Sequence, residues 1–152
     1  MAREGREKSL MRSQIRETAL DYAKAFRGVP YEWGGDNPQG LDCSGFVGLV
    51  LRSVGLMANK QDLTAKGIFD KFAQYATETP SAGCLVLYGR SLDKISHIAI
   101  MIDSRHILEA GGGNSKTVDK ETADERNAFV RMRPFNYRTP LAIVDPFRSF
   151  PS

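Results

Sequence analysis

The chain has 152 residues and a mass of 16.9 kDa, which suits one domain with a buried core. Hydrophobic residues make up 41% and charged residues 26%, the balance of a soluble globular protein. No apolar run reaches the roughly 18 residues of a membrane-spanning helix, so we expect no membrane insertion. The net charge is +3, and the basic excess lies at the two ends. Because no dense basic stripe with interleaved aromatic residues occurs, nucleic-acid binding is not expected.

The start of the chain carries no apolar stretch of the length that a secretory signal needs. We therefore expect synthesis in the cytosol and another route to any site of action outside the cell. In such a chain the two cysteines, Cys43 and Cys84, are expected to be reduced thiols. Neither the cysteines nor the two histidines have the short spacing of a structural zinc site, so no metal is expected.

The first half of the chain has helical patterns. After a basic segment, 1–11, apolar residues from about 12 to 26 recur at helical spacing. The stretch 29–42 is dense in Gly, Pro, Asn and Asp and predicts a shaped loop. Residues 43–54 are apolar nearly all round, which predicts a central, buried helix. Asp62 can cap a third helix.

The second half of the chain is rich in β-forming residues. The segments with strand character are 84–89, 96–103, 106–110 and 129–135. Segments 96–103 and 106–110 are close enough in sequence to form a hairpin. Segment 129–135 alternates apolar and basic residues, which is typical of an edge strand. Residues 111–128 predict a loop, and 136–152 a tail docked by its apolar residues. We therefore expect one α+β domain over 1–152, with helices packed on a small antiparallel sheet.

Cys43 stands where the shaped loop becomes the buried helix. Its sulfur would face the positive end of the helix dipole, an environment that favours the thiolate and makes Cys43 a candidate nucleophile. A buried, inert cysteine is the alternative.

A cysteine nucleophile needs a base, and His97 is the polar side chain in the apolar strand HIAIMI. His97, Ala99 and Met101 share one face of this strand, and the isoleucines face the core. We expect the small Ala99 to let the Cys43 helix approach closely. A core histidine without a catalytic role is the alternative.

The predicted hairpin selects a partner for His97. If the turn centres on Asp103, Glu109 stands directly opposite His97 and can orient its imidazole. His106 would then pair with Ile100, point to the other face and be a surface residue. A one-residue slip in register would exchange these assignments.

Three blocks of sequence resemble, in order, the signatures of the NlpC-type cell-wall cysteine peptidases, which are papain-like thiol hydrolases of bacteria and their phages. The blocks are PYEWGGDNPQGLDCSGFV (30–47), SAGCLVLYG (81–89) and HIAIMIDSRHILEAGGG (97–113). The resemblance covers about residues 12–135. It implies a papain-like fold, with the nucleophile helix on the sheet, and calls for no cofactor.

The resemblance also implies roles for individual residues. Cys43 falls on the nucleophile, His97 on the base and Glu109 on the third catalytic position. Tyr31 falls on a tyrosine near the reacting carbonyl, where its hydroxyl can help to hold the oxyanion beside the backbone N–H of Cys43.

Other positions are implied to contact the substrate. Asp42 and Ser44 fall on positions that hold the free amine and neighbouring groups of a stem peptide. Trp33 is a candidate wall of the substrate groove, with core packing as its alternative, and the glycines 111–113 are a candidate lip of that groove or simply a turn.

Two positions depart from the family pattern. Glu109 stands where the family usually has His, Asn or Gln, and a carboxylate there would raise the pKa of the histidine. Cys84 stands where an acidic residue is usual, and its place at the start of an apolar strand favours a structural role.

The resemblance implies a cysteine peptidase acting on peptidoglycan stem peptides, with the bond from γ-D-glutamate to the diamino acid as the expected target. One alternative is a thiol amidase or acyltransferase of the same fold. Another is a non-catalytic wall-binding or phage tail component. Without a recognisable leader, we expect the cell wall to be reached by phage release or virion delivery, with phage tail or lysis proteins as partners. A domain whose exporting partner is unknown is the alternative.

Overall fold

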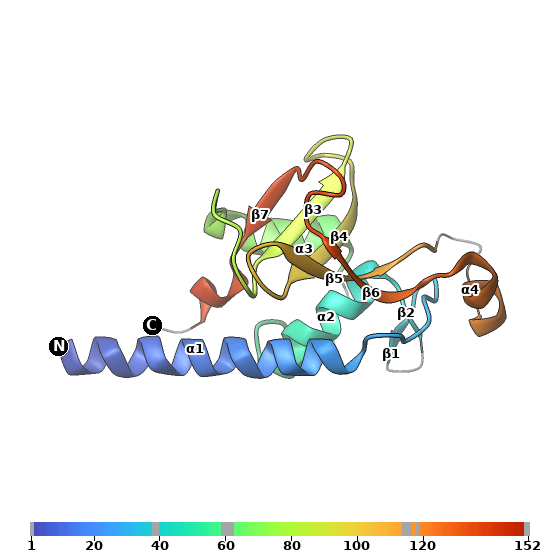
Figure 1. The fold of residues 1–152 in the computed structure, drawn as a ribbon. Helices are drawn as coiled ribbons and strands as arrows, with labels where there is room; N and C mark the ends of the chain where they lie inside the picture. Colours follow the sequence, from blue (N-terminus) through green and yellow to red (C-terminus); the bar gives the residue numbers. More distant parts are fainter. Residues whose placement is uncertain (1, 38–39, 59–62, 114–116, 118, 151–152) are drawn as a thin grey trace.

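A computed structural model describes residues 2–37, 40–58, 63–113, 117 and 119–150 (Figure 1). The helices are α1 (Ala2–Ala25), α2 (Cys43–Ser53), α3 (Ala65–Phe72) and α4 (Lys120–Arg126), with 3-10 turns η1 (Ala73–Tyr75) and η2 (Pro146–Ser149). The strands of the main sheet are β3 (Leu85–Gly89), β4 (Ile95–Met101), β5 (His106–Gly111), β6 (Phe129–Pro134) and β7 (Ala142–Val144). A short antiparallel pair, β1 (Asp36–Asn37) and β2 (Gly40–Leu41), precedes α2.

The described strands of the main sheet lie in the order β6-β5-β4-β3-β7, and each pairs antiparallel with its neighbours. Helix α2 lies between α1 and this sheet (Figure 1). The predicted core face is confirmed, because Ile98 and Ile100 are fully buried in the same cluster as Phe46 and Val50 of α2. Burying these apolar surfaces is the main contribution to the stability of the helix–sheet layer.

The opposite face of the sheet has a smaller core of its own. Its buried members are Cys84, Val86, Tyr88, Ala99, Met101 and Ile107. Phe135 and Tyr137, from the segment after β6, pack against it. The expectation that Ala99 makes room for the Cys43 helix is wrong, because Ala99 lies in this second cluster whereas α2 packs on the isoleucine face.

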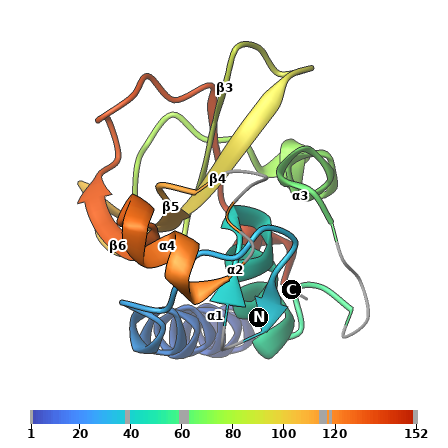
Figure 2. The same cartoon turned by 90° about the vertical axis from the view of Figure 1, so that its right-hand side faces the viewer.

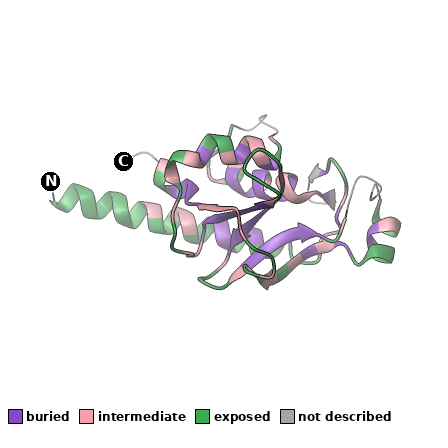
Figure 3. Ribbon diagram, turned by 90° about the horizontal axis from the view of Figure 1, so that it is seen from above, coloured by how far each residue is buried: buried purple, intermediate pink, exposed green. Residues whose placement is uncertain are grey.

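Helix α1 begins ten residues before the predicted start. The segment 1–11 was expected to precede the helix, yet from Ala2 onward it is helical and mostly exposed (Figure 3). Its polar turns carry ion pairs at helical spacing, Arg3 with Glu7 at 3.4 Å and Lys8 with Glu4 at 3.8 Å. Charge pairs support this helix where apolar periodicity does not.

The segment 111–128 was predicted to be a loop, and this is wrong for α4. Asp119 caps the helix by accepting a hydrogen bond of 2.8 Å from the backbone N–H of Thr122, and Ala123 is its buried residue. Asn127 ends it in the left-handed conformation, with φ 54°. A helix that buries one small residue leaves almost no apolar periodicity in the sequence.

The predicted tail is an integral part of the fold. Residues 142–144 form β7, the strand at the edge beside β3, and Phe147 of η2 is fully buried. Arg16 of α1 binds Asp145 at 3.1 Å and covers the ring of Phe147. These contacts hold η2 against α1, beside which it lies in Figure 1, and Figure 2 gives the view along α1.

Thr64 caps the third helix by accepting a hydrogen bond of 3.0 Å from the backbone N–H of Gly67. The predicted capping residue, Asp62, lies outside the described residues. Ile68 and Phe72 form the buried face of α3. Within the described ranges, no helix combines the length and apolar character needed to cross a membrane.

Candidate active site

Asp42 fixes the start of α2. Its carboxylate accepts hydrogen bonds from the backbone N–H groups of Gly45 at 2.7 Å and Gly34 at 3.0 Å. Any side chain at Gly45 would overlap the carbonyl oxygen of Gly35, so glycine allows the preceding loop to lie directly on the helix. Cys43 is thereby held as the first residue of α2, at the positive end of the helix.

The hairpin that carries His97 has a different register from the predicted one. Ile100 pairs with Leu108 and Met101 with Ile107, whereas we expected Ile100 opposite His106. The centre of the turn lies one residue after the predicted centre. The partner of each β4 residue therefore lies two positions further along β5 than predicted. Because side chains alternate with a period of two, an even displacement keeps every residue on its predicted face.

His97 and Glu109 therefore still meet, as diagonal rather than directly opposed residues. The His97 Nε2 and Glu109 Oε2 atoms are 2.5 Å apart. The alternative partner, His106, is excluded from this position: its Nδ1 lies 3.0 Å from Oδ2 of Asp103, and its side chain is 40% exposed. His106 is a surface residue, as predicted.

Glu109 is buried among donors. Its side chain is 1% exposed, and Oε1 accepts from Arg131 Nε at 3.3 Å and from Arg133 Nη1 at 3.4 Å. Oε2 accepts a further hydrogen bond from the Tyr137 hydroxyl at 3.2 Å. Burial raises the pKa of Glu109, but the hydrogen bond and charge of His97, with those of Arg131, lower it more strongly. Glu109 is thus a carboxylate.

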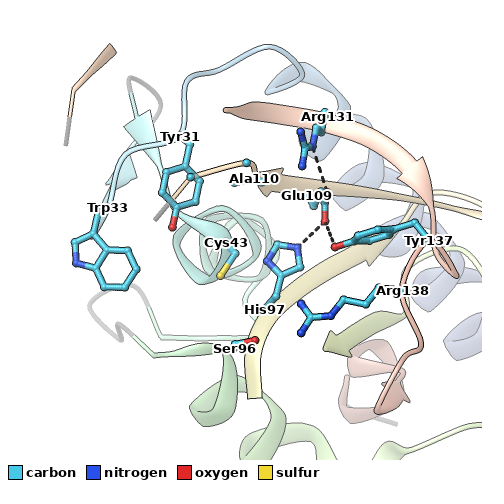
Figure 4. Close-up of a pocket in the computed structure, with 13 residues that line it drawn as sticks. Tyr31, Trp33, Cys43, Ser96, His97, Glu109, Ala110, Arg131, Tyr137 and Arg138 are labelled. Atoms are coloured by element: carbon cyan, nitrogen blue, oxygen red, sulfur yellow. Dashed lines mark hydrogen bonds and ion pairs between the residues drawn. The ribbon is translucent and has the colours of Figure 1, made fainter. Parts of the chain in front are cut away.

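His97 lies between this carboxylate and Cys43. With Nε2 directed at Glu109, the other ring nitrogen faces the sulfur of Cys43 (Figure 4). Burial lowers the pKa of His97, but hydrogen bonds to Cys43 and Glu109, and the charges of both, raise it to about 9. The site therefore favours the imidazolium form of His97 beside Cys43 at neutral pH.

The candidate catalytic residues line one cavity of about 430 Å³. Cys43, His97, Glu109, Tyr31 and Trp33 all reach it. The glycines 111–113 also line it, in agreement with the predicted lip. Tyr31 and Glu109, which are 78 positions apart in the sequence, are thus brought to one opening.

Tyr31 and Trp33 form one wall of this cavity. The Tyr31 hydroxyl points toward Cys43 (Figure 4), and any side chain at Gly113 would overlap the Tyr31 ring. Burial, followed by the charges of Cys43 and Asp42, raises the pKa of Tyr31, so its hydroxyl keeps its proton and can donate. Trp33 is 55% exposed, so the core alternative for Trp33 is wrong.

Asp42 and Ser44 do not line the cavity that holds Cys43. They line a smaller hollow of about 160 Å³, together with Gly34, Gly35, Leu63 and Thr64. Since the two residues flank Cys43 in sequence, this hollow lies beside Cys43. Part of the Asp42 carboxylate is already engaged in capping α2.

Sequence reasoning missed the partners of Glu109 and two further residues of the cavity, Ser96 and Arg138. Arg131 pairs directly opposite Glu109 in the β5–β6 register, and Arg133 lies two residues along on the same face. The alternation of FVRMRP places both arginines on one face, which is the signal that could have found them. Tyr137 lies beyond the strand, in the segment expected to be a tail.

Cys84 is fully buried and contacts Ser81 Oγ at 3.3 Å. Burial raises the pKa of the Cys84 thiol, which disfavours the reactive thiolate and agrees with the structural role predicted for it. Among the residues that the structure describes, no three His, Cys, Asp or Glu side chains are grouped so as to hold a metal ion.

Two proteins of Bacillus subtilis are similar to this chain in sequence. LytE of Bacillus subtilis strain 168, a probable peptidoglycan endopeptidase, is 34% identical over 93 residues, which is 59% of this chain and 25% of LytE. CwlT of the same strain, a bifunctional muramidase/DL-endopeptidase, is 26% identical over 117 residues, 75% of this chain and 35% of CwlT. The chain thus spans a quarter to about a third of these relatives.

Solved structures share the fold. The NlpC/p60 domain of the peptidoglycan hydrolase SagA superposes with a TM-score of 0.61 and 22% identity, covering 85% of this chain and 97% of that domain. The P60 domain of antigen MAP1204 from M. avium subspecies paratuberculosis superposes with a TM-score of 0.64 and 19% identity. The superposition covers 90% of this chain and 98% of that domain. The predicted α+β, papain-like fold is confirmed. Residues 28–133 match the NlpC/P60 family, and the chain belongs to that family.

Proposed function

We propose that this chain is a cysteine peptidase that hydrolyses an amide bond in peptidoglycan stem peptides. The observation that carries the proposal is the placement of His97 between Cys43 and Glu109 at an open cavity. Relatives named as peptidoglycan endopeptidases, such as LytE, support the choice of substrate.

The first half of the reaction forms an acyl-enzyme. The Cys43 thiolate attacks the carbonyl carbon, and the carbonyl electron pair moves to oxygen, where the backbone N–H of Cys43 and the Tyr31 hydroxyl stabilise the oxyanion. As the C–N bond breaks, the His97 imidazolium gives its proton to the leaving amine. The amine departs, and the acyl group stays on sulfur as a thioester.

The second half releases the acid. Neutral His97 takes a proton from water, and the resulting hydroxide attacks the thioester carbon. Collapse of this intermediate expels the thiolate, which again faces an imidazolium. Glu109 holds the ring in place through both halves and favours its charged form.

The bond that we propose joins γ-D-glutamate to the diamino acid of the stem. The hollow beside Cys43, bordered by Asp42 and Ser44, is the proposed place for the amine end of the peptide. Trp33 supplies an exposed aromatic wall along the same side.

Mass spectrometry of purified muropeptides after digestion tests the proposal. We expect the L-alanyl-γ-D-glutamate fragment and a peptide that begins with the free diamino acid. Cleavage between the sugar and the stem would instead assign an amidase, and a transferred acyl group an acyltransferase. Intact muropeptides after prolonged digestion with reduced protein would contradict hydrolysis altogether.

A further inference from the structure

The cavity continues past His97 to an arginine that the proposed reaction does not use. Arg138 follows β6 and lines the cavity together with Ser96 and Tyr137. Figure 4 shows its guanidinium directed back toward His97 and Ser96 rather than away from the opening. Within the described part of the chain Arg138 is exposed and forms no ion pair, so its charge is available to a ligand.

The charges around the cavity favour an anion. Among the described residues that line the cavity, Glu109 is the only acidic one. Its carboxylate is already bound by His97, Arg131 and Arg133. Arg131 and Arg138 add two positive charges to the same lining. A guanidinium binds a carboxylate through two parallel N–H donors, which makes this the ligand group that Arg138 fits best.

Gly111 and Gly112 leave part of the Arg131 guanidinium open to the cavity. Side-chain atoms at Gly111 and Gly112 would lie 3.1 Å and 3.3 Å from the terminal nitrogens of Arg131. Since glycine leaves these positions empty, the guanidinium that holds Glu109 through Nε keeps access to the cavity on its other edge.

The position of Arg138 defines the part of the substrate that it would meet. His97 gives its proton to the leaving amine, so the leaving portion of the peptide lies on the His97 side of Cys43. Trp33 lies on the opposite side of Cys43, and Arg138 lies beyond His97 (Figure 4). An anion bound at Arg138 therefore belongs to the leaving portion.

We propose that Arg138 forms a carboxylate-binding subsite that selects substrates whose leaving amino acid carries a free carboxylate. This inference rests on the proposed function for the direction of the peptide. It predicts that the chain prefers stems in which the residue released as an amine has an unblocked carboxyl group.

Two peptides test the subsite: L-alanyl-γ-D-glutamyl-L-lysine with a free carboxyl terminus, and its C-terminal amide. Both contain the same scissile bond and the same glutamate carboxylate, so they differ in one charge. We expect kcat/KM about tenfold higher for the acid. Arg138→Gln should reduce this ratio to near one, and Arg138→Lys should restore part of it. Arg105→Gln, in the exposed turn between β4 and β5, is the matched control and should keep the full ratio.

Binding to the Cys43→Ala variant separates this inference from the proposed function. By calorimetry, we expect the acid to bind about tenfold more tightly than the amide, and the difference to vanish when Arg138→Gln is added. If the unmodified chain cleaves neither peptide, the proposed function fails while the binding ratio still decides the subsite. Equal affinities for acid and amide, no binding of either, or a ratio unaffected by Arg138→Gln would overturn the subsite.

Discussion

Replacing Cys43 with alanine should lower kcat/KM for stem-peptide hydrolysis by at least about 10⁴-fold. In the proposed reaction, the sulfur of Cys43 is the atom that forms the acyl-enzyme. No other described side chain of the cavity is a nucleophile of comparable strength. The fold should survive, because Cys43 lies at the edge of the core and the Asp42 cap of α2 is independent of the thiol. Steady-state hydrolysis and thermal unfolding measure the two effects.

Cys84→Ala is the matched control, since it removes the chain's other thiol. This residue lies in the core on the far face of the sheet, so its loss should leave kcat/KM within about twofold of the unmodified chain. Hydrolysis that persists in Cys43→Ala but disappears in Cys84→Ala would exchange the roles that we assign to the two cysteines.

Replacing Glu109 with glutamine should lower kcat/KM on the order of a hundredfold and change its pH dependence. The carboxylate raises the pKa of His97, so its removal should bring that pKa down from about 9. The imidazolium form of His97, which protonates the leaving amine, is then lost at a lower pH in Glu109→Gln than in the unmodified chain. In the unmodified chain activity should fall as pH rises through about 9, and in Glu109→Gln this alkaline limb should move toward neutrality.

The surface pair of Asp103 and His106 provides the control for this experiment. Asp103→Asn also removes a carboxylate bound to a histidine, but at an exposed turn outside the cavity. It should change neither the rate nor the alkaline limb. An identical pH profile for Glu109→Gln and the unmodified chain would show that Glu109 does not set the charge of His97.

The parts of the site predicted correctly from sequence depend on local chemistry. The loop that turns into an apolar helix fixes Cys43 at the start of α2, and the alternation of HIAIMI fixes which side chains face the core. The contact between His97 and Glu109 survived an error in register because the error was even. A displacement by one residue would have put Glu109 on the other face.

The parts that sequence could not supply depend on long-range pairing or on polar surfaces. Arg131 and Tyr137 reach Glu109 only once β6 has paired with β5 and the following segment has folded over the sheet. Helix α4 and the first turns of α1 bury too little apolar surface to show a helical period. Residues 142–144 of the predicted tail form β7 because they pair with the edge of β3. The local sequence carries no signal of this long-range pairing.

The proposed chemistry depends on the pairing of His97 with Cys43, and a ¹⁵N NMR titration of the His97 ring tests this pairing directly. In a His106→Gln background, which leaves one histidine, the ring should stay protonated up to about pH 9. In the same background with Cys43→Ala, the midpoint should move to lower pH, because a negative partner is lost. A midpoint near 6.5, the ordinary value for histidine, in both proteins would contradict the pairing on which the proposed chemistry depends.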